Sequence, residues 1–226
     1  MWVLLFGARI ATSQELTFSQ IDGSPAQARG AMVLKELYQR LDMQIEFKNL
    51  PGHRALRMSN AGDTDGEIFR IWEVGFTHPN LIRVPTPLLT LHGYAFMLTP
   101  PTIDNLQGLN DIPRIGIQRG IIWAENAVRG RKGVVRVTTA AELADKLAKG
   151  AIDVALATED AIVEDFSKKN TNVTLHHSKA LTSIKVYHYL HNKHEGLLEK
   201  VDREIMEMTK TKELEKIANF PFHNVN

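Results

Sequence analysis

The sequence predicts a mixed α/β fold with two lobes, and three observations lead to this prediction. Short apolar strands alternate with helices, an order typical of parallel sheets whose connections cross over as helices. The alternation occurs twice within the 226 residues, in residues 16–72 and again in residues 114–178. Two extended segments, 90–101 and 182–191, lie between and after these halves. A chain that leaves one lobe, builds a second and returns needs two such crossings.

The first half is expected to run strand, helix, strand, helix, strand. Ser24 and Pro25 have the residue types of an N-cap and a first helical residue, and apolar residues at helical spacing follow them. Gly62 has the residue type that ends a helix in the left-handed conformation. The expected strands are LTFSQI (16–21), MQIEFKNLP (43–51) and the apolar end of GDTDGEIFRIW (62–72).

The second half repeats this order and is followed by a helical C-terminal region. Its expected elements are a strand at 114–118, a helix opened by Gly120, a strand at 133–137, a capped helix at 138–150, a strand at 152–157, a helix at 158–169 and a strand at 173–178, before the helical region at 195–220. We expect lobe one to hold residues 15–97 and 184–226, and lobe two residues 98–183. Both sheets would point the carboxyl ends of their strands at the space between the lobes, where ligands bind in such folds.

Composition excludes several classes of function. Lys and Arg number 27 against 26 for Asp and Glu, a net charge of +1 that does not favour a nucleic-acid partner. Without cysteine, the chain has no disulfides, thiolate metal sites or cysteine nucleophiles. His188 and His191 would point to opposite faces of an extended segment, which does not favour a metal site. Neither a cofactor nor a metal is expected.

Residues 1–14 are interpreted as the remnant of an export signal. An apolar run from Trp2 to Phe6 is followed by small residues, and Ala11 and Ser13 are spaced like a signal-peptidase site. The alternative is an ordinary first strand. The first interpretation predicts an exported, periplasmic protein.

Several motifs, in order, carry a resemblance to a known family. They are VLKELYQRLDMQIEFKNLP, GDTDGEIFR, PTPLLTLHGYAFML, LNDIPRIGIQRG, ELADKLAKGAIDVALAT and YHYLHNKHEGLLEKVD. Together they resemble the type II periplasmic solute-binding proteins of family 3, the amino-acid and polar-solute binders of ABC transporters. The resemblance implies a two-lobed fold with two crossover segments. It also implies a monomer that binds a small polar solute and serves an ABC permease or a membrane sensor.

Two departures separate this sequence from the amino-acid binders of that family. Those proteins usually carry a carboxylate-clamping arginine after the third strand, and the corresponding stretch EVGFTHPN (73–80) has none. The acidic residue that often takes the amino group follows a later strand, and Thr158 stands closest to that position.

Arg70 is the main candidate for ligand binding in lobe one. It ends the third strand and would share one face with Ile68 and Trp72. An arginine fork beside an aromatic ring suits an anionic ligand, above all a carboxylate. The alternative is a structural ion pair with Glu67 or Glu73.

The remaining candidates lie at other strand ends that face the expected cleft. The predicted ligand-binding set is Asp22, Arg70, Trp72, Gln118, Arg119, Gly120, Ile121, Thr158, Glu159 and Asp160. Free N–H groups at the start of the helix after Gln118 favour an anion, although a plain tight turn is the alternative. Glu159 and Asp160 would cap a helix or face a cationic group on the ligand. Each of Trp72, Trp123 and Tyr94 is either an aromatic wall of the cleft or part of the core.

The sequence predicts a non-catalytic protein that captures a small polar, carboxylate-bearing solute for uptake or sensing. The alternative is an enzyme on the same fold, similar to periplasmic cyclohexadienyl dehydratases, with Glu159 or Asp160 as the acid group. A sensory or interaction domain is a third interpretation. We find no Walker-type loop, Gly-x-Ser-x-Gly or His-Glu-x-x-His motif in the sequence.

Overall fold

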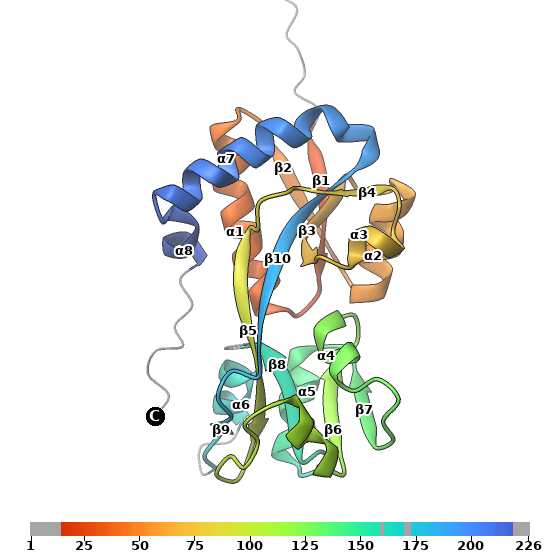
Figure 1. The fold of residues 1–226 in the computed structure, drawn as a ribbon, viewed down its shortest axis with the longest axis vertical. Coiled ribbons are helices and arrows are strands. Elements are labelled where there is room, and N and C mark those ends of the chain that lie inside the picture. Colours follow the sequence, from red (N-terminus) through yellow and green to blue (C-terminus); the bar gives the residue numbers. More distant parts are fainter. Residues whose placement is uncertain (1–14, 159–160, 170–172, 219–226) are drawn as a thin grey trace, which may run out of the picture.

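The computed structural model describes residues 15–158, 161–169 and 173–218. These residues form two lobes, one above the other along the long axis, and two strands run from one lobe to the other (Figure 1). The segment 1–14, interpreted above as an export signal, lies outside the described residues, as do Glu159 and Asp160. Within the described ranges, no helix has both the length and the apolar character needed to cross a membrane.

The first lobe contains the N-terminal and C-terminal elements. They are β1 (Leu16–Ile21), α1 (Pro25–Arg40), β2 (Ile45–Leu50), α2 (Gly52–Ala61), β3 (Gly66–Ile71), α3 (Val74–Thr77), β4 (Leu81–Arg83), η2 (Asn192–Leu197), α7 (Leu198–Lys210) and α8 (Glu213–Ala218). The expected caps are present. The Ser24 hydroxyl accepts a hydrogen bond from the N–H of Gln27 and so caps α1. Gly62 ends α2 at φ 84°.

The second lobe lies between the two crossing strands in the sequence. It contains η1 (Leu106–Asp111), β6 (Ile115–Gln118), α4 (Ile122–Ala127), β7 (Val134–Val137), α5 (Ala140–Ala148), β8 (Val154–Thr158), α6 (Val163–Lys169) and β9 (His176–His177). The crossing strands are β5 (Leu89–Met97) and β10 (Thr182–His191). The Thr139 hydroxyl caps α5 by accepting from the N–H of Glu142.

The strands form one continuous path, in the order β2-β1-β3-β10-β5-β8-β6-β7, with β4 and β9 beside it. This differs from the two separate sheets expected from the sequence. The reason is that β5 serves both lobes: Leu89–Gly93 pair with β10, and Gly93–Phe96 pair with β8. The strands at the two ends of the path, β2-β1-β3 and β8-β6-β7, pair in parallel, as predicted. In the middle, β5 and β10 pair antiparallel with their neighbours.

Three expected elements are shorter or are divided. The strand expected at 173–178 is the two-residue β9, and the helix expected to start at 158 begins at Val163. The helical C-terminal region is divided into η2, α7 and α8. Lys212 has φ 58° between the last two helices, a left-handed backbone that interrupts a helix.

The apolar core is divided in the same way as the lobes. The main cluster of the first lobe includes Phe18, Leu34 and Val186, and a smaller one there includes Leu56 and Tyr189. Two others fill the second lobe on the two sides of β8. Trp123 packs against the first-lobe cluster and against one of the second-lobe clusters. The boundaries at residues 97/98 and 183/184 stay a prediction, although the separate cores support two units.

A buried polar cluster attaches β10 to β3 inside the first lobe. His188 is fully buried, its Nδ1 lies 2.8 Å from the carbonyl oxygen of Glu67, and its Nε2 lies 2.9 Å from the Tyr38 hydroxyl. Nδ1 must donate to the carbonyl, so Nε2 accepts from Tyr38. Burial lowers the pKa of His188 to about 4, which keeps the ring neutral at pH 7.

Candidate functional site

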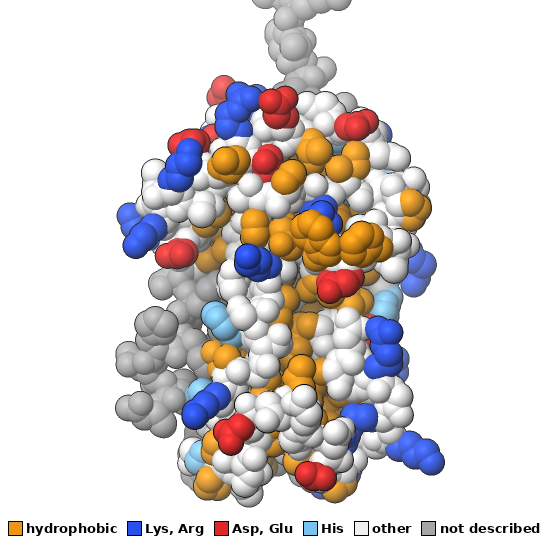
Figure 2. All heavy atoms as spheres, viewed as in Figure 1, with side chains coloured by type: hydrophobic (Ala, Val, Ile, Leu, Met, Phe, Trp, Pro, Cys, Tyr) orange, Lys and Arg blue, Asp and Glu red, His pale blue; other side chains and the backbone are white. Residues whose placement is uncertain are grey.

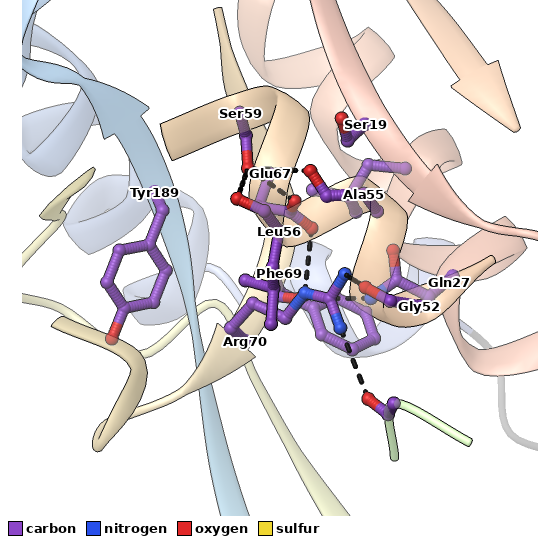
Figure 3. Close-up of polar contacts among 12 residues, drawn as sticks. Ser19, Gln27, Gly52, Ala55, Leu56, Ser59, Glu67, Phe69, Arg70 and Tyr189 are labelled. Carbon is purple, nitrogen blue, oxygen red and sulfur yellow. Dashed lines mark hydrogen bonds and ion pairs between the residues drawn. The ribbon is translucent and has the colours of Figure 1, made fainter. Parts of the chain in front are cut away.

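Arg70, at the carboxyl end of β3, lies where the two lobes meet. Its side chain is buried, and its Nε donates to Glu67 Oε2 at 2.7 Å. Nη2 donates to the carbonyl oxygen of Gly52 at 3.1 Å, in the same lobe. Nη1 donates to the carbonyl oxygen of Gly120 at 3.3 Å, in the other lobe. The guanidinium therefore joins three elements of the chain across the boundary of the lobes (Figure 3).

Glu67 is the counter-ion of this arginine. The sequence left Glu67 and Glu73 open as partners, and the ion pair forms with Glu67. The carboxylate is fully buried, and its second oxygen accepts a 2.6 Å hydrogen bond from the Ser59 hydroxyl. Burial raises the pKa of Glu67, while Arg70 and Ser59 oppose that rise. Because the guanidinium does not lose its proton, Glu67 balances its charge inside the protein.

The lobes also touch through two glycines. A Cβ on Gly52 would lie 2.9 Å from the Cα of Gly120, and a Cβ on Gly120 would lie 2.6 Å from the Cα of Gly52. Both distances are too short for real side chains, so the two backbones approach as closely as glycine allows. Gly120 also has φ 82°, a conformation that favours glycine. The structure is thus a closed arrangement of the lobes.

Further polar contacts lie on both sides of this glycine pair. Gln118 Nε2 donates to the carbonyl oxygen of Asp22 at 3.3 Å, from the second lobe to the first. It also donates to Thr138 within its own lobe at 3.1 Å. His53 Nε2 lies 3.0 Å from Glu125 Oε1 across the boundary, at a more exposed position. These contacts link the two lobes directly.

A partly open cavity of about 60 Å³ lies between the lobes. Its walls are mainly apolar and come from both lobes, with Ile21, Phe69 and Ile184 from the first and Ile121, Leu156 and Ile162 from the second. Its polar lining consists of Ser24, Gln27, Arg70, Gln118 and Thr158. Trp123 also lines it. A concave, mostly apolar pocket with a few polar groups is the usual form of a small-molecule site.

The structure places six of the predicted site residues at this cavity or at its edge. Arg70, Gln118, Gly120, Ile121 and Thr158 line it, and Asp22 reaches its edge through its carbonyl oxygen. Arg119 lies at the lobe boundary with an exposed side chain, and its carbonyl oxygen faces Gly52. Glu159 and Asp160, next to Thr158 in sequence, lie outside the described residues.

Trp72 lies elsewhere, in an outer groove of about 660 Å³. β3 ends at Ile71, so the alternation expected to bring Arg70 and Trp72 to one face stops between them. The indole ring is 42% exposed, packs edge-on against Tyr187 and has the guanidinium of Arg83 over its face. Figure 2 shows hydrophobic side chains gathered on this face along the boundary between the lobes.

Sequence reasoning missed two residues at the lobe boundary, Gln27, which lines the cavity, and Gly52, which contacts the other lobe. The sequence pattern gives Gln27 no particular role, but its place in the first turn of α1 brings it to the cleft end of β1. Its Nε2 donates to the carbonyl oxygen of Phe69. Gly52 opens α2, and nothing in its local sequence indicates a contact with residue 120. The position of Gln27 could have been predicted from the topology, because helices of such folds begin at the edge of the sheet where ligands bind.

No protein-family model and no curated protein matches the sequence. Solved structures do match. A histidine kinase sensor domain with similarity to periplasmic binding proteins superposes with a TM-score of 0.75 at 17% identity, covering 90% of this chain and 94% of that one. An ancestral arginine-binding protein bound to glutamine gives 0.74 at 17% identity, with 92% and 97% covered. A substrate-binding protein of an amino acid ABC transporter from Streptococcus pneumoniae, bound to L-arginine, gives 0.71 at 15% identity, with 92% and 94% covered. The chain therefore has the two-lobed periplasmic-binding-protein fold predicted from its sequence.

Proposed function

We propose that the protein is an exported, monomeric and non-catalytic solute-binding protein that traps a small molecule between its lobes for uptake or sensing. One observation carries the proposal: a cavity lined from both lobes lies beside Arg70, whose guanidinium donates to carbonyl groups on both sides. A molecule in this cavity contacts both lobes at once. It therefore binds the closed arrangement better than an open one, which is the condition for ligand-driven closure.

Closure by hinge motion fits the connections between the lobes. The chain passes between them along β5 and β10, two strands that pair with each other. In a hinge motion, a few residues in such connections absorb the dihedral changes while each core stays packed. The contacts that separate on opening are then those of Arg70 with Gly120 and of Gln118 with Asp22.

The sequence also predicts a carboxylate on the solute, and this stays a prediction. It depends on Arg70, which lines the cavity but already donates to Glu67 and to two carbonyl groups. A carboxylate would have to use the remaining N–H groups of the guanidinium or displace the carbonyl of Gly120. It would also add a second negative charge close to Glu67.

Uptake and sensing both have support among the structural relatives, which include transporter substrate-binding proteins and a sensor domain. We propose an ABC permease or a membrane sensor as the partner. The dehydratase-like alternative needs a cleft carboxyl group with a raised pKa. Glu159 and Asp160 are its candidates by sequence, next to Thr158 at the cavity.

The test combines binding, closure and product analysis. Purified protein is screened by thermal shift against amino acids, dicarboxylates, polyamines, aromatic acids and their amides, because a molecule that binds the folded state raises the melting temperature. Each hit is followed by small-angle scattering, where closure lowers the radius of gyration, and by mass spectrometry of the recovered solute. A hit that leaves the scattering of a demonstrably open protein unchanged argues against trapping. A chemically altered solute favours the enzyme.

A further inference from the structure

Two buried polar atoms of side chains that line the cavity have no hydrogen-bond partner among the residues that the structure describes. They are Oε1 of Gln27 and the indole Nε1 of Trp123, and both side chains line the cavity. Gln27 is 1% exposed, and its amide orientation is fixed because Nε2 donates to the carbonyl oxygen of Phe69 at 2.9 Å. Buried polar groups in proteins are nearly always paired, so one unpaired acceptor and one unpaired donor at a single cavity call for an explanation.

The charge at the cavity is balanced within the protein. Among its described lining residues, Arg70 is the one with a charged side chain, and Glu67 pairs with it at 2.7 Å. The amide nitrogen of Gln118 donates to two carbonyl groups of the chain. An ionic group entering here would lose its hydration without gaining a free counter-charge from these residues, which is strongly unfavourable.

We propose that the cavity takes a small uncharged molecule with an apolar body and one neutral donor–acceptor group, such as a primary amide. The donor of this group bonds to Gln27 Oε1, and its acceptor receives the indole N–H of Trp123. The apolar body packs against the aliphatic and aromatic walls from both lobes. The inference rests on the proposed function and specifies its ligand class.

The volume limits the size of the ligand. The cavity holds about 60 Å³, whereas an apolar cavity of about 150 Å³ is known to hold benzene. A molecule of a few heavy atoms fits inside the closed arrangement. A molecule of benzene's size, such as isobutyramide, extends through the open side of the cavity or requires the lobes to separate slightly. Free amino acids differ from this class because their charged ammonium and carboxylate groups each require a partner.

Three probes of similar shape separate charge from size: isobutyramide, isobutyrate and isobutylamine. Their dissociation constants are measured at pH 7 by titration of protein NMR signals. We expect isobutyramide to bind at least about tenfold more tightly than either ion, because an unpaired buried charge costs more than about 1.4 kcal/mol, which is a factor of ten.

Two variants test the named hydrogen bonds. Trp123→Phe keeps an aromatic ring but removes the N–H. Gln27→Met keeps the length but removes the acceptor, together with the Nε2 donor to the carbonyl oxygen of Phe69. Each is expected to weaken isobutyramide binding about threefold to tenfold, the range of one neutral hydrogen bond. Trp123 lines both the cavity and the outer groove, whereas Trp72 lines only the groove. Trp72→Phe is therefore the matched control, and it should leave affinity unchanged. Circular dichroism confirms that each variant is folded.

The outcomes separate this inference from the proposed function. If isobutyrate or isobutylamine binds as tightly as the amide, the inference is wrong, while solute binding between the lobes stands. Equal affinities of wild type, Trp123→Phe and Gln27→Met would also overturn it, because the two atoms would then be satisfied by water alone. If none of the three probes binds and the broader screen finds no ligand, the inference and the proposed function fail together.

Discussion

The substitution Gly52→Ala should hinder closure without harming either lobe. Gly52 is the first residue of α2 and its φ is not positive, so alanine fits its backbone conformation. Replacing glycine by alanine at a compatible position stabilises a fold by about 0.4–1 kcal/mol. The added methyl group meets its obstacle in the other lobe, where the Cα of Gly120 would lie 2.9 Å away and the carbonyl oxygen of Arg119 3.0 Å away.

The cost to the closed arrangement follows from these distances. Carbon atoms pack at about 3.5–4.0 Å, so the backbones must separate by a large part of an ångström. The bond from Arg70 Nη1 to the carbonyl oxygen of Gly120 already measures 3.3 Å and would pass beyond hydrogen-bond range. A hydrogen bond of a charged group contributes about 1.5–3 kcal/mol. Solute affinity should therefore fall about tenfold to a hundredfold.

The assay measures the radius of gyration by small-angle scattering and the affinity for whichever solute the thermal-shift screen identifies. Gly196→Ala is the control, because a Cβ there would meet nothing within 4 Å and its backbone is not left-handed. We expect Gly52→Ala to be more open than the control at equal or higher thermal stability. The reasoning is refuted if both variants match wild type in scattering and affinity, because the glycine contact would then not limit closure.

Three further predictions concern the ionisable groups. Glu67→Gln should destabilise the protein by about 3–5 kcal/mol in urea unfolding, because it leaves the buried Arg70 without a counter-ion; a change below about 1 kcal/mol would show that the pair is not needed. His188→Gln should flatten the pH dependence of the unfolding free energy. The pKa of His188 is about 4 in the folded protein, whereas a histidine in the unfolded chain binds its proton near pH 6.5. Wild type therefore loses about 3 kcal/mol of stability from this group as pH falls from 6.5 to 4. Equal slopes of unfolding free energy against pH in the two proteins would contradict this. His53→Ala should change solute affinity by less than about 1 kcal/mol, because its pair with Glu125 is partly exposed, and a larger loss in calorimetry would assign this contact a main role in closure.

Much of the fold was predictable because the helix-capping residues and the apolar patterns indicate the same order of elements that the structure shows. Ser24 caps α1 and Gly62 ends α2 at the positions that their residue types indicate. The two extended segments became the long strands β5 and β10. The continuous path of strands was not predictable. Pairing along both halves of β5 depends on how the two lobes are placed relative to each other, and residue patterns do not encode that placement.

The candidate site was predictable in location but not in its bonding. The carboxyl ends of the strands placed Arg70, Gln118 and Thr158 near a cleft, and they line the cavity. The partners of Arg70 could not be read from the sequence, because two of them are carbonyl groups, which every residue has. The separation of Trp72 from Arg70 depends on where β3 stops, and strand ends are the least predictable part of a sequence-based assignment.

The bonding of Arg70 links closure to the kind of solute that the protein can hold. In a site where the ligand alone bridges the lobes, the ligand must supply all of the free energy that favours closing. Here Arg70, Gln118 and the glycine pair already supply contacts across the boundary. The solute then needs less differential affinity to shift the population toward the closed form, which supports the proposal of a small uncharged ligand. Changes at Gly52 should consequently alter solute affinity although this residue does not line the cavity, because they change the free energy of closing itself.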